Sequence, residues 1–192
     1  KVKWRGGEVW AMGEKVGTEE GGKKRETNEL MSSISKRRSL REKLMQEAKT
    51  YGVDGCNLDF ESLRAEAGPH YVQCIRELSV SCRREGLVLS IDNYVPSDYT
   101  SFYNRKEQGT VADYVIVMGY DEHYAGGDPG SVASIGYVQD GIENTLKEVR
   151  REKVINSVPF YTRVWAEAEG AVTYRACGWA KAKVGGAGSE GG

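Results

Sequence analysis

Polar and apolar residues alternate in the stretch DGCNLDFE, residues 54–61, and the polar ones are of types that could do chemistry. They are one amide and two acids: Asn57, Asp59 and Glu61. On a β-strand, residues two apart point to the same face and lie roughly 6.6 Å apart. The opposite face then takes the apolar members: Cys56, Leu58 and Phe60. The stretch therefore predicts a strand that packs on one face and presents two carboxylates and an amide on the other.

Two neighbouring acids on one strand face are expected to differ in protonation. Burying two ionisable acids is costly unless they pair or share a proton. We expect the charge of Asp59 to keep Glu61 protonated near neutral pH, as a general acid must be. The alternative is an ordinary strand end whose acids reach solvent or cap the next helix. The full eight-residue pattern after an amphipathic helix favours the functional interpretation more than a DxE pair alone would.

Strand-like and helix-like segments alternate along the chain and would position these acids. Strand-sized apolar runs cover 8–12, 53–60, 87–95, 112–120 and 153–161. Apolar residues recur at helical spacing over 36–51, 68–85 and 136–150, whereas 97–111 is a less regular connection. This order predicts parallel βαβ units, with helix C-caps at Gly52, Gly86 and Gly109.

The βαβ pattern fits either a doubly wound open sheet or part of a (β/α)8 barrel. No GxGxxG or GxxxxGK[ST] motif follows any strand, which removes the main support for a nucleotide-binding sheet. Residues 1–165 are expected to form the folded unit. Residues 166–192 are expected to form an irregular extension with a Gly-rich tail ending in GGAGSEGG.

Composition limits the partners that this chain of 192 residues is expected to have. The formal net charge is −1 at pH 7, so no overall basic field predicts binding of nucleic acid or an anionic membrane. The longest apolar runs are strand-sized, which predicts no membrane-spanning segment. Four cysteines without a CxxC pair, together with two histidines, predict free buried thiols and no metal site. The chain starts at Lys1 rather than Met, and we expect that its natural N-terminus has been removed.

Several segments resemble family 18 glycoside hydrolases, the chitinase-like barrels. D-G-x-N-x-D-F-E resembles the signature of their fourth strand, and GGEVWAM resembles their third. VADYVIVMGYDEHYAGGDPGSVASIGYVQDGIENTL resembles their sixth strand with its loop and helix, and EKVINSVPFYTRVW resembles the seventh. The resemblance implies an α/β fold of the (β/α)8 TIM-barrel type, incomplete here because only strands three to seven are recognisable. YDEHY, VAS and PFYTR point to the branch of bacterial spore-cortex and cell-wall peptidoglycan hydrolases.

The resemblance also implies roles for individual residues. Glu61 would be the general acid, Asp59 would orient and stabilise the acetamido group of the substrate, and Tyr120 would donate a hydrogen bond to that group. Further substrate contacts are implied for Asn57, Met118, Asp121, Tyr161, Arg163 and Trp165. The family uses the acetamido oxygen of the substrate as nucleophile, so no cofactor or metal is expected. Chitinases commonly carry Asp where this chain has Asn57, which shifts the expected substrate towards peptidoglycan.

The implied function is a retaining glycosidase that acts on β-1,4-linked N-acetylglucosamine in peptidoglycan or, as the second choice, in chitin. Its expected location is the cell envelope, the spore or the outside of the cell. Two alternatives remain open: a non-catalytic carbohydrate-binding remnant and a structural remnant of such a barrel. A barrel without three of its strands has two open parallel edges, which predicts self-association.

Overall fold

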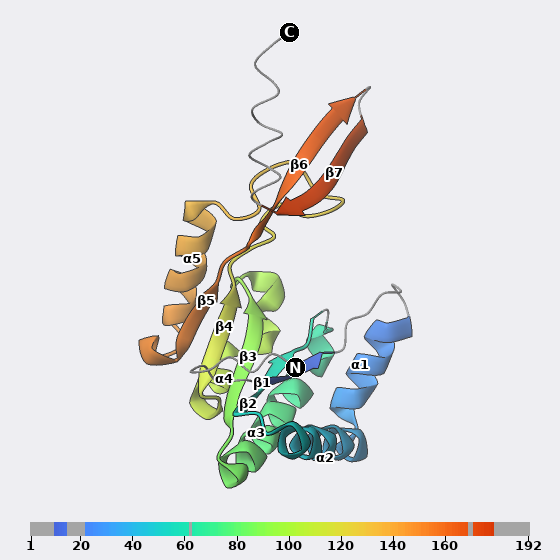
Figure 1. Cartoon of the computed structure of the whole chain (residues 1–192), viewed down its shortest axis with the longest axis vertical. Helices are drawn as coiled ribbons and strands as arrows, with labels where there is room; N and C mark the ends of the chain where they lie inside the picture. The colour runs from blue at the N-terminus through green and yellow to red at the C-terminus, as the bar shows by residue number, and fades with distance from the viewer. Residues whose placement is uncertain (1–9, 15–21, 62, 169–170, 179–192) are drawn as a thin grey trace.

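A five-stranded parallel sheet forms the centre of the molecule, in the order β1-β2-β3-β4-β5 (Figure 1). The structure, a computed structural model, describes residues 10–14, 22–61, 63–168 and 171–178. The strands are β1 (Trp10–Glu14), β2 (Gly55–Asp59), β3 (Val88–Tyr94), β4 (Tyr114–Met118) and β5 (Val154–Ser157). The spatial order equals the chain order, so the sheet lacks the reversal of a doubly wound fold. The parallel βαβ prediction is confirmed.

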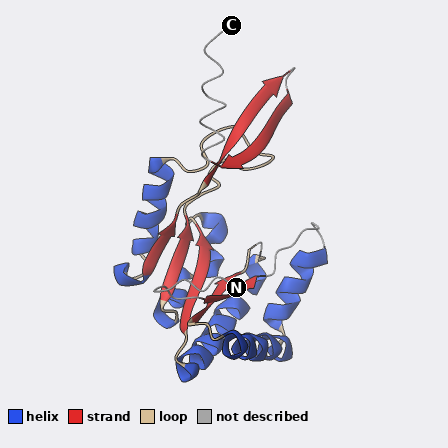
Figure 2. Cartoon of the chain, viewed as in Figure 1, coloured by secondary structure: helices blue, strands red, loops and turns tan. Residues whose placement is uncertain are grey.

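In the described part of the chain, five α-helices and three 3₁₀ turns connect these strands. Figure 2 shows the helices beside the sheet. The helices are α1 (Gly22–Ser32), α2 (Ile34–Tyr51), α3 (Gly68–Glu85), α4 (Arg105–Val111) and α5 (Ile135–Leu146). The 3₁₀ turns are η1 (Ala65–Ala67), η2 (Asp98–Tyr103) and η3 (Arg151–Lys153). None of these helices has both the length and the apolar character needed to cross a lipid bilayer.

The predicted helices correspond to α2, α3 and α5, and the exceptions have local causes. Gly52 and Gly86 end α2 and α3 with φ of 57° and 69°, as left-handed C-caps should. The prediction of a less regular connection over 97–111 is wrong, because η2 and α4 occupy this segment. Gly109 lies inside α4, not at a cap, and a Cβ there would come within 2.9 Å of Val149. Its role is close packing.

The main core lies on the helix-covered face of the sheet. This is the face that the alternation in β2 assigned to apolar residues. Leu58 and Ile91 are fully buried there against Tyr71, Ile75 and Leu78 of α3. The thiols of Cys56, Cys74, Cys82 and Cys177 are also buried and free, as the sequence predicted. Strands β2 and β3 are therefore anchored on one face and can present polar side chains on the other.

An antiparallel hairpin follows the sheet and projects beyond the carboxyl end of β5 (Figure 1). It consists of β6 (Tyr161–Ala168) and β7 (Ala171–Gly178). The single strand predicted over 153–161 stops at Ser157, close to Pro159, which has no N–H to donate to a ladder. The expected irregular extension from Ala166 is instead strand throughout its described part, residues 166–168 and 171–178. Residues 179–192, with the Gly-rich tail, lie outside the described residues.

Candidate active site

Polar side chains from β2 and β3 lie next to one another on the face opposite the core. The strand register pairs Asn57 with Ser90, and alternate residues share a face, so Asp59 and Asp92 belong to this face too. The amide of Asn57 donates to Ser90 Oγ at 2.8 Å and to Asp92 Oδ1 at 3.3 Å. Asn57 thus binds β3 through its side chain, and the acid at position 92 is one that the sequence analysis did not single out.

Glu61 lies on the loop after β2 and is exposed to solvent. The strand ends at Asp59, so the polar alternation continues past the last ladder residue. Tyr103 of η2 fixes this loop, because its hydroxyl donates to the backbone oxygen of Phe60 at 3.1 Å. The same hydroxyl accepts from the backbone N–H of Leu63 at 3.4 Å. The backbone is therefore held on both sides of Glu61.

Tyr103 is in turn held by a buried amide pair. Gln108 of α4 donates to the backbone oxygen of Tyr103 at 2.8 Å. The side chains of Gln108 and Asn93 exchange two hydrogen bonds, at 2.7 and 3.0 Å, and both residues are almost fully buried. Asn93 belongs to β3, on the core face. A continuous chain of contacts therefore connects the middle of the sheet to the loop that carries Glu61.

Tyr120 lies two residues after the end of β4, which is separated from β2 by β3. Met118, two residues earlier, is the register partner of Tyr94 and is 6% exposed. Burial raises the pKa of Tyr120 to about 12, and the negative charges of nearby acids add to the rise: Asp92, Asp59 and Glu61. The phenol therefore keeps its proton at neutral pH and can serve as a hydrogen-bond donor.

The carboxyl group of Asp92 is influenced by the charges of Asp59 and Glu61. Burial raises the pKa of its carboxyl group to about 6. The hydrogen bond from Asn57 lowers this pKa, whereas the negative charges of Asp59 and Glu61 raise it. The three acids Asp59, Glu61 and Asp92 and the phenol of Tyr120 thus influence one another electrostatically near the carboxyl ends of β2, β3 and β4.

A second cluster joins the β4–α5 loop to the hairpin. Asp121, with a left-handed φ of 59°, accepts hydrogen bonds from Tyr161 and Arg163. The Arg163 guanidinium lies 2.7 Å from Asp121 Oδ1 and also donates to the backbone oxygen of His123 at 3.0 Å. The ring centroids of Tyr161 and Tyr120 are 6.4 Å apart. The structure thus brings Asp121, Tyr161 and Arg163 together and connects them to the site through Tyr120.

Trp165 lies further along the hairpin. Its indole N–H donates to the backbone oxygen of Gly130 at 2.9 Å, and its ring is 5.8 Å from that of Tyr174. Among the described residues, these contacts join Trp165 to Gly130 and Tyr174 rather than to the acids. Among the described residues, no group of three or more His, Cys, Asp or Glu is arranged to hold a metal ion.

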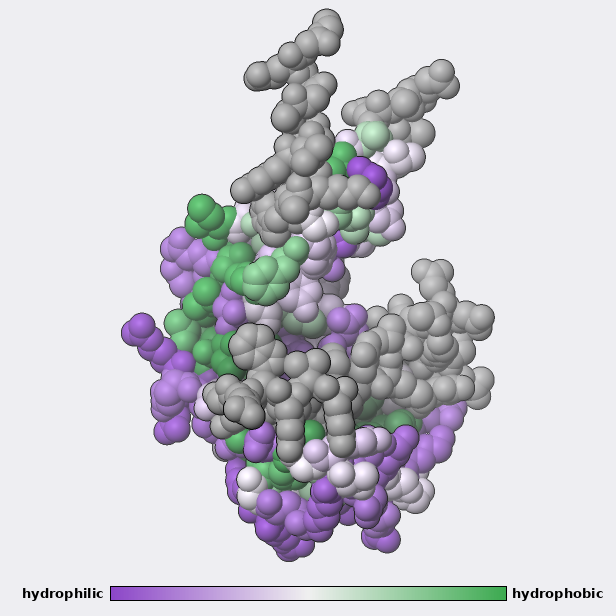
Figure 3. Space-filling view, viewed as in Figure 1, coloured by the Kyte–Doolittle hydropathy of each residue, from purple (hydrophilic) through white to green (hydrophobic). Residues whose placement is uncertain are grey.

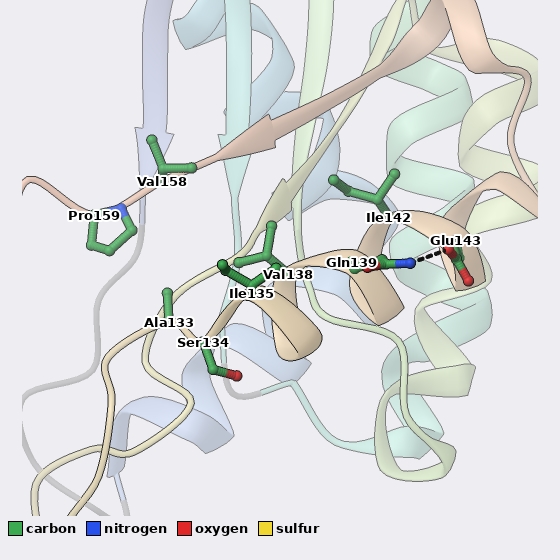
Figure 4. Close-up of a pocket in the computed structure, with 9 residues that line it drawn as sticks. All are labelled: Ala133, Ser134, Ile135, Val138, Gln139, Ile142, Glu143, Val158 and Pro159. Atoms are coloured by element: carbon green, nitrogen blue, oxygen red, sulfur yellow. Dashed lines mark hydrogen bonds between the residues drawn. The ribbon is translucent and has the colours of Figure 1, made fainter.

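A mainly apolar cavity lies apart from Asp59, Glu61 and Asp92. It has a volume of about 530 Å³ and lies between α5 and the end of β5 (Figure 4). Its lining residues are Ala133, Ser134, Ile135, Val138, Gln139, Ile142, Glu143, Val158 and Pro159. Figure 3 shows hydrophobic residues gathered over the same side of the molecule. Because the lining contains none of Asp59, Glu61 and Asp92, we regard the polar face of β2–β4 as the candidate site.

Two residues of the site were missed by sequence reasoning. Asp92 had a readable signal, because Ser90 and Asp92 in LSIDNY repeat the two-residue spacing of polar side chains seen in β2. Tyr103 had none, because it lies in a segment without helix or strand periodicity. Its contact with the Glu61 loop spans about forty residues of sequence and depends on how η2 packs.

Comparisons with known proteins give the site its context. A family model described as glycosyl hydrolases family 18 matches residues 15–187. The chain is 28% identical over 150 residues to the uncharacterized glycosylase YvbX of Bacillus subtilis (strain 168), covering 75% of this chain and 44% of that protein. It is 30% identical over 142 residues to the cortical fragment-lytic enzyme of the same organism, covering 71% of this chain and 33% of that protein.

A solved chitinase from Chromobacterium violaceum ATCC 12472 has the same fold over much of this chain. The TM-score is 0.74 at 22% identity, over 82% of this chain and 50% of the chitinase chain. The chain therefore spans between a third and a half of the lengths of these three proteins. Since the family model covers most of the sequence, the chain belongs to the glycosyl hydrolases of family 18.

Proposed function

We propose that this chain carries the catalytic centre of a glycosidase that cleaves β-1,4-linked N-acetylglucosamine with retention of configuration. The observation that carries the proposal is the position of Asp59, Glu61 and Tyr120 at the carboxyl ends of β2 and β4 in one parallel sheet, where the charges of both acids act on the Tyr120 phenol. Active sites of barrels built from βα units are found at that end. We further propose that the five strands are part of such a barrel.

The proposed mechanism uses the acetamido group of the substrate as nucleophile. Glu61 gives its proton to the glycosidic oxygen while the bond from that oxygen to C1 breaks and the acetamido oxygen bonds to C1. Asp59 stabilises the positive charge that forms on the acetamido group. Glu61, now ionised, takes a proton from water, and the water oxygen displaces the acetamido oxygen from C1. Two inversions at C1 give retention.

The environment of Tyr120 supports its part in this mechanism. The group that positions the acetamido oxygen must donate a hydrogen bond and must not ionise. Burial and neighbouring negative charge raise the pKa of Tyr120 to about 12, so it remains a neutral donor across the working range. Asp121, Tyr161 and Arg163 would bind the neighbouring sugar from the loop and the hairpin, with Trp165 further out.

The proposed substrate is peptidoglycan rather than chitin. One relative has a name that describes lysis of cortical fragments, and the position of Asn57 carries an amide where chitinases commonly carry an acid. By the same reasoning the proposed location is the spore or the cell envelope. A non-catalytic carbohydrate-binding protein is the alternative, and it would need neither an exposed Glu61 nor a protonated tyrosine beside it.

Replacing Glu61 tests the proposal in the protein that carries this chain. We expect Glu61→Gln to lower hydrolysis of N-acetylglucosamine-containing glycan by about 10²–10⁴-fold while glycan binding persists, because the amide cannot donate the proton. Glu66→Gln is the matched control, since Glu66 is also an exposed acid of the same segment. Equal turnover by Glu61→Gln and the wild type would refute the assignment.

Removing the acetyl group of the substrate tests the mechanism. Glucosamine in place of the cleaved N-acetylglucosamine lacks the attacking oxygen but keeps most binding contacts. We expect kcat to fall far more than affinity, and a thiazoline mimic of the cyclised sugar to inhibit. Similar kcat values on acetylated and deacetylated glycans would rule out substrate assistance and the roles given to Asp59 and Tyr120.

A further inference from the structure

A third carboxyl group lies among the proposed catalytic residues, although no role has been given to it. Asp92 occupies the middle of β3, and its Oδ1 accepts a hydrogen bond from the Asn57 amide at 3.3 Å. The same amide nitrogen lies 2.8 Å from Ser90 Oγ, and Ser90 is fully buried. The side chain of Asp92 is therefore held towards β2 on the polar face of the sheet.

Asp59 and Asp92 are lateral neighbours on adjacent parallel strands. The strand register pairs Leu58 with Ile91, and the next position of each strand is an acid on the polar face. Adjacent strands are about 4.8 Å apart, a distance at which two carboxylates strongly oppose each other's ionisation. The crowding is mutual, because the charge of each acid acts equally on the other.

The groups that face Asp92 come from both neighbouring strands and from its own. Asp59 and Glu61 act on it from β2 and its loop, and Tyr120 interacts with it from beyond the end of β4. On β3 itself, alternation places Tyr94 on the same face. The charges that act on Asp92 from the described residues are both negative, those of Asp59 and Glu61. The pKa of Asp92, raised to about 6, fits this setting. Ionisation of Asp92 therefore adds one negative charge to the cluster.

We propose that Asp92 is a further positioning residue of the glycosidase site: with Asp59 it forms an acid pair whose total charge holds the catalytic proton on Glu61. When Asp92 is ionised, its negative charge makes the loss of a proton from Glu61 harder. Asn57 cannot fill this position, because an amide has no proton to lose in this range. This inference rests on the proposed function for its catalytic consequence, though not for the acid pair itself.

The acid pair can be measured without any substrate. Carbon-13 NMR of aspartate carboxyl groups in the whole chain gives a titration midpoint for each acid. In Asp92→Asn we expect the midpoint of Asp59 to move to lower pH, because the neighbouring charge is gone. Ser90→Ala is the matched control: it removes the other acceptor of the Asn57 amide and leaves the charge of Asp92 in place. An unchanged Asp59 midpoint in Asp92→Asn would overturn the acid pair.

The catalytic consequence is measured by the pH dependence of kcat/KM on an N-acetylglucosamine oligomer. We expect Asp92→Asn to move the alkaline limb to lower pH, with a loss of about threefold to tenfold on that side and little change on the acid side. Ser90→Ala should leave the limb in place. Equal limbs in Asp92→Asn and the wild type would overturn the inference while leaving the proposed function intact.

A double variant gives a rescue test. Asn57→Asp combined with Asp92→Asn exchanges the amide and the acid while keeping a hydrogen bond between the two positions. We expect it to bring the alkaline limb back towards that of the wild type, which neither a packing defect nor a lost hydrogen bond at position 92 predicts. Failure of this rescue in a variant that unfolds at the wild-type temperature would contradict the charge mechanism.

The two proposals fail in different ways. A wild-type protein without hydrolytic activity would refute the proposed function, yet the NMR midpoints would still decide whether Asp59 and Asp92 form a pair. An active wild type with an inactive Glu61→Gln variant, but with neither midpoint nor limb altered in Asp92→Asn, would refute the acid pair alone.

Discussion

A single carboxyl group should give this protein a pH-dependent stability. The pKa of Asp92 is raised from 3.8 to about 6, so the folded state binds this proton more tightly than the unfolded state does. The stabilisation from the bound proton is fully present below about 3.8 and is lost as pH rises through about 6. Above that range, the ionised Asp92 carboxylate lowers the free energy of unfolding.

Asp92→Asn should therefore stabilise the fold only where Asp92 is ionised. We expect a gain of about 1–2 kcal/mol in the free energy of unfolding above pH ~6, discounted because water still reaches the carboxyl group, and no gain below pH ~4. Urea unfolding at both pH values measures this difference. Asp98→Asn, at an exposed acid, should show no such pattern. A gain of equal size at both pH values would contradict the pKa shift.

At the residue scale, the sequence predicts which face of a strand a side chain lies on. It does not predict which side chains on neighbouring strands will be its partners. Asn57 and Asp59 lie opposite the core because alternation is a local property of the backbone. The partner of Asn57 is a different matter, because Asp92 reaches it only through the register of β2 against β3. The exposed position of Glu61 likewise depends on where β2 stops pairing.

At the scale of elements, η2 is the part that holds the loop carrying Glu61. We expect Tyr103→Phe to lower the free energy of unfolding by about 1–3 kcal/mol, because the buried Phe60 oxygen and Leu63 N–H lose their partner. The same variant should lower kcat, because the backbone on both sides of Glu61 is released. Chemical denaturation and steady-state kinetics measure the two effects.

Tyr71→Phe is the matched control for this prediction. Tyr71 is fully buried in the same aromatic cluster, with its ring centroid 5.7 Å from that of Tyr103. Its hydroxyl makes no hydrogen bond to any of the described residues. We expect the control to leave stability unchanged or increase it. Equal losses in the two variants would show that packing, not the hydrogen bonds of Tyr103, fixes the loop.

Sequence predicted elements well where one periodicity covers them and poorly where two influences compete. α2 and α3 agree with their predicted spans because long amphipathic helices carry a repeated signal. The segment over 97–111 escaped prediction because η2 and α4 are short and meet at Asn104, whose φ of 54° interrupts any period. The hairpin escaped because Pro159 separates β5 from β6 within one apolar run.

At the scale of the whole molecule, an apolar surface runs along α5 and the end of β5 (Figure 3). Ile135 is 86% exposed and Val158 is 56% exposed, and both line the cavity of about 530 Å³. Among the described strands, β5 pairs only with β4, so its other edge carries unpaired backbone groups. Surfaces of this kind favour association.

We expect the 192-residue chain, studied alone, to self-associate through this surface. Sedimentation velocity over a range of concentrations should show the average mass rising with concentration. Ile135→Glu should weaken the association, whereas Tyr99→Glu, at an apolar side chain 90% exposed elsewhere, should not. A monomer at all concentrations would show that the surface is tolerated in water.

The barrel architecture could be predicted from the sequence only through its resemblance to family 18 glycoside hydrolases. Periodicity predicts strands and helices, but the direction in which a sheet curves and closes depends on contacts between its first and last strands. The order β1 to β5 without reversal fits a singly wound sheet, and the family match fits a barrel. Neither follows from the local pattern of any one segment.

The labelling rates of the four buried thiols can report how often different parts of the folded chain open. A thiol reacts with an alkylating reagent only when it is exposed and ionised, so the labelling rate of a buried cysteine reports how often its surroundings open. Cys56, Cys74 and Cys82 lie in the sheet and α3, whereas Cys177 lies in β7 of the hairpin. Faster labelling of Cys177 than of the other three would mean that the hairpin, and with it the Tyr161–Arg163 side of the proposed site, opens while the sheet stays closed.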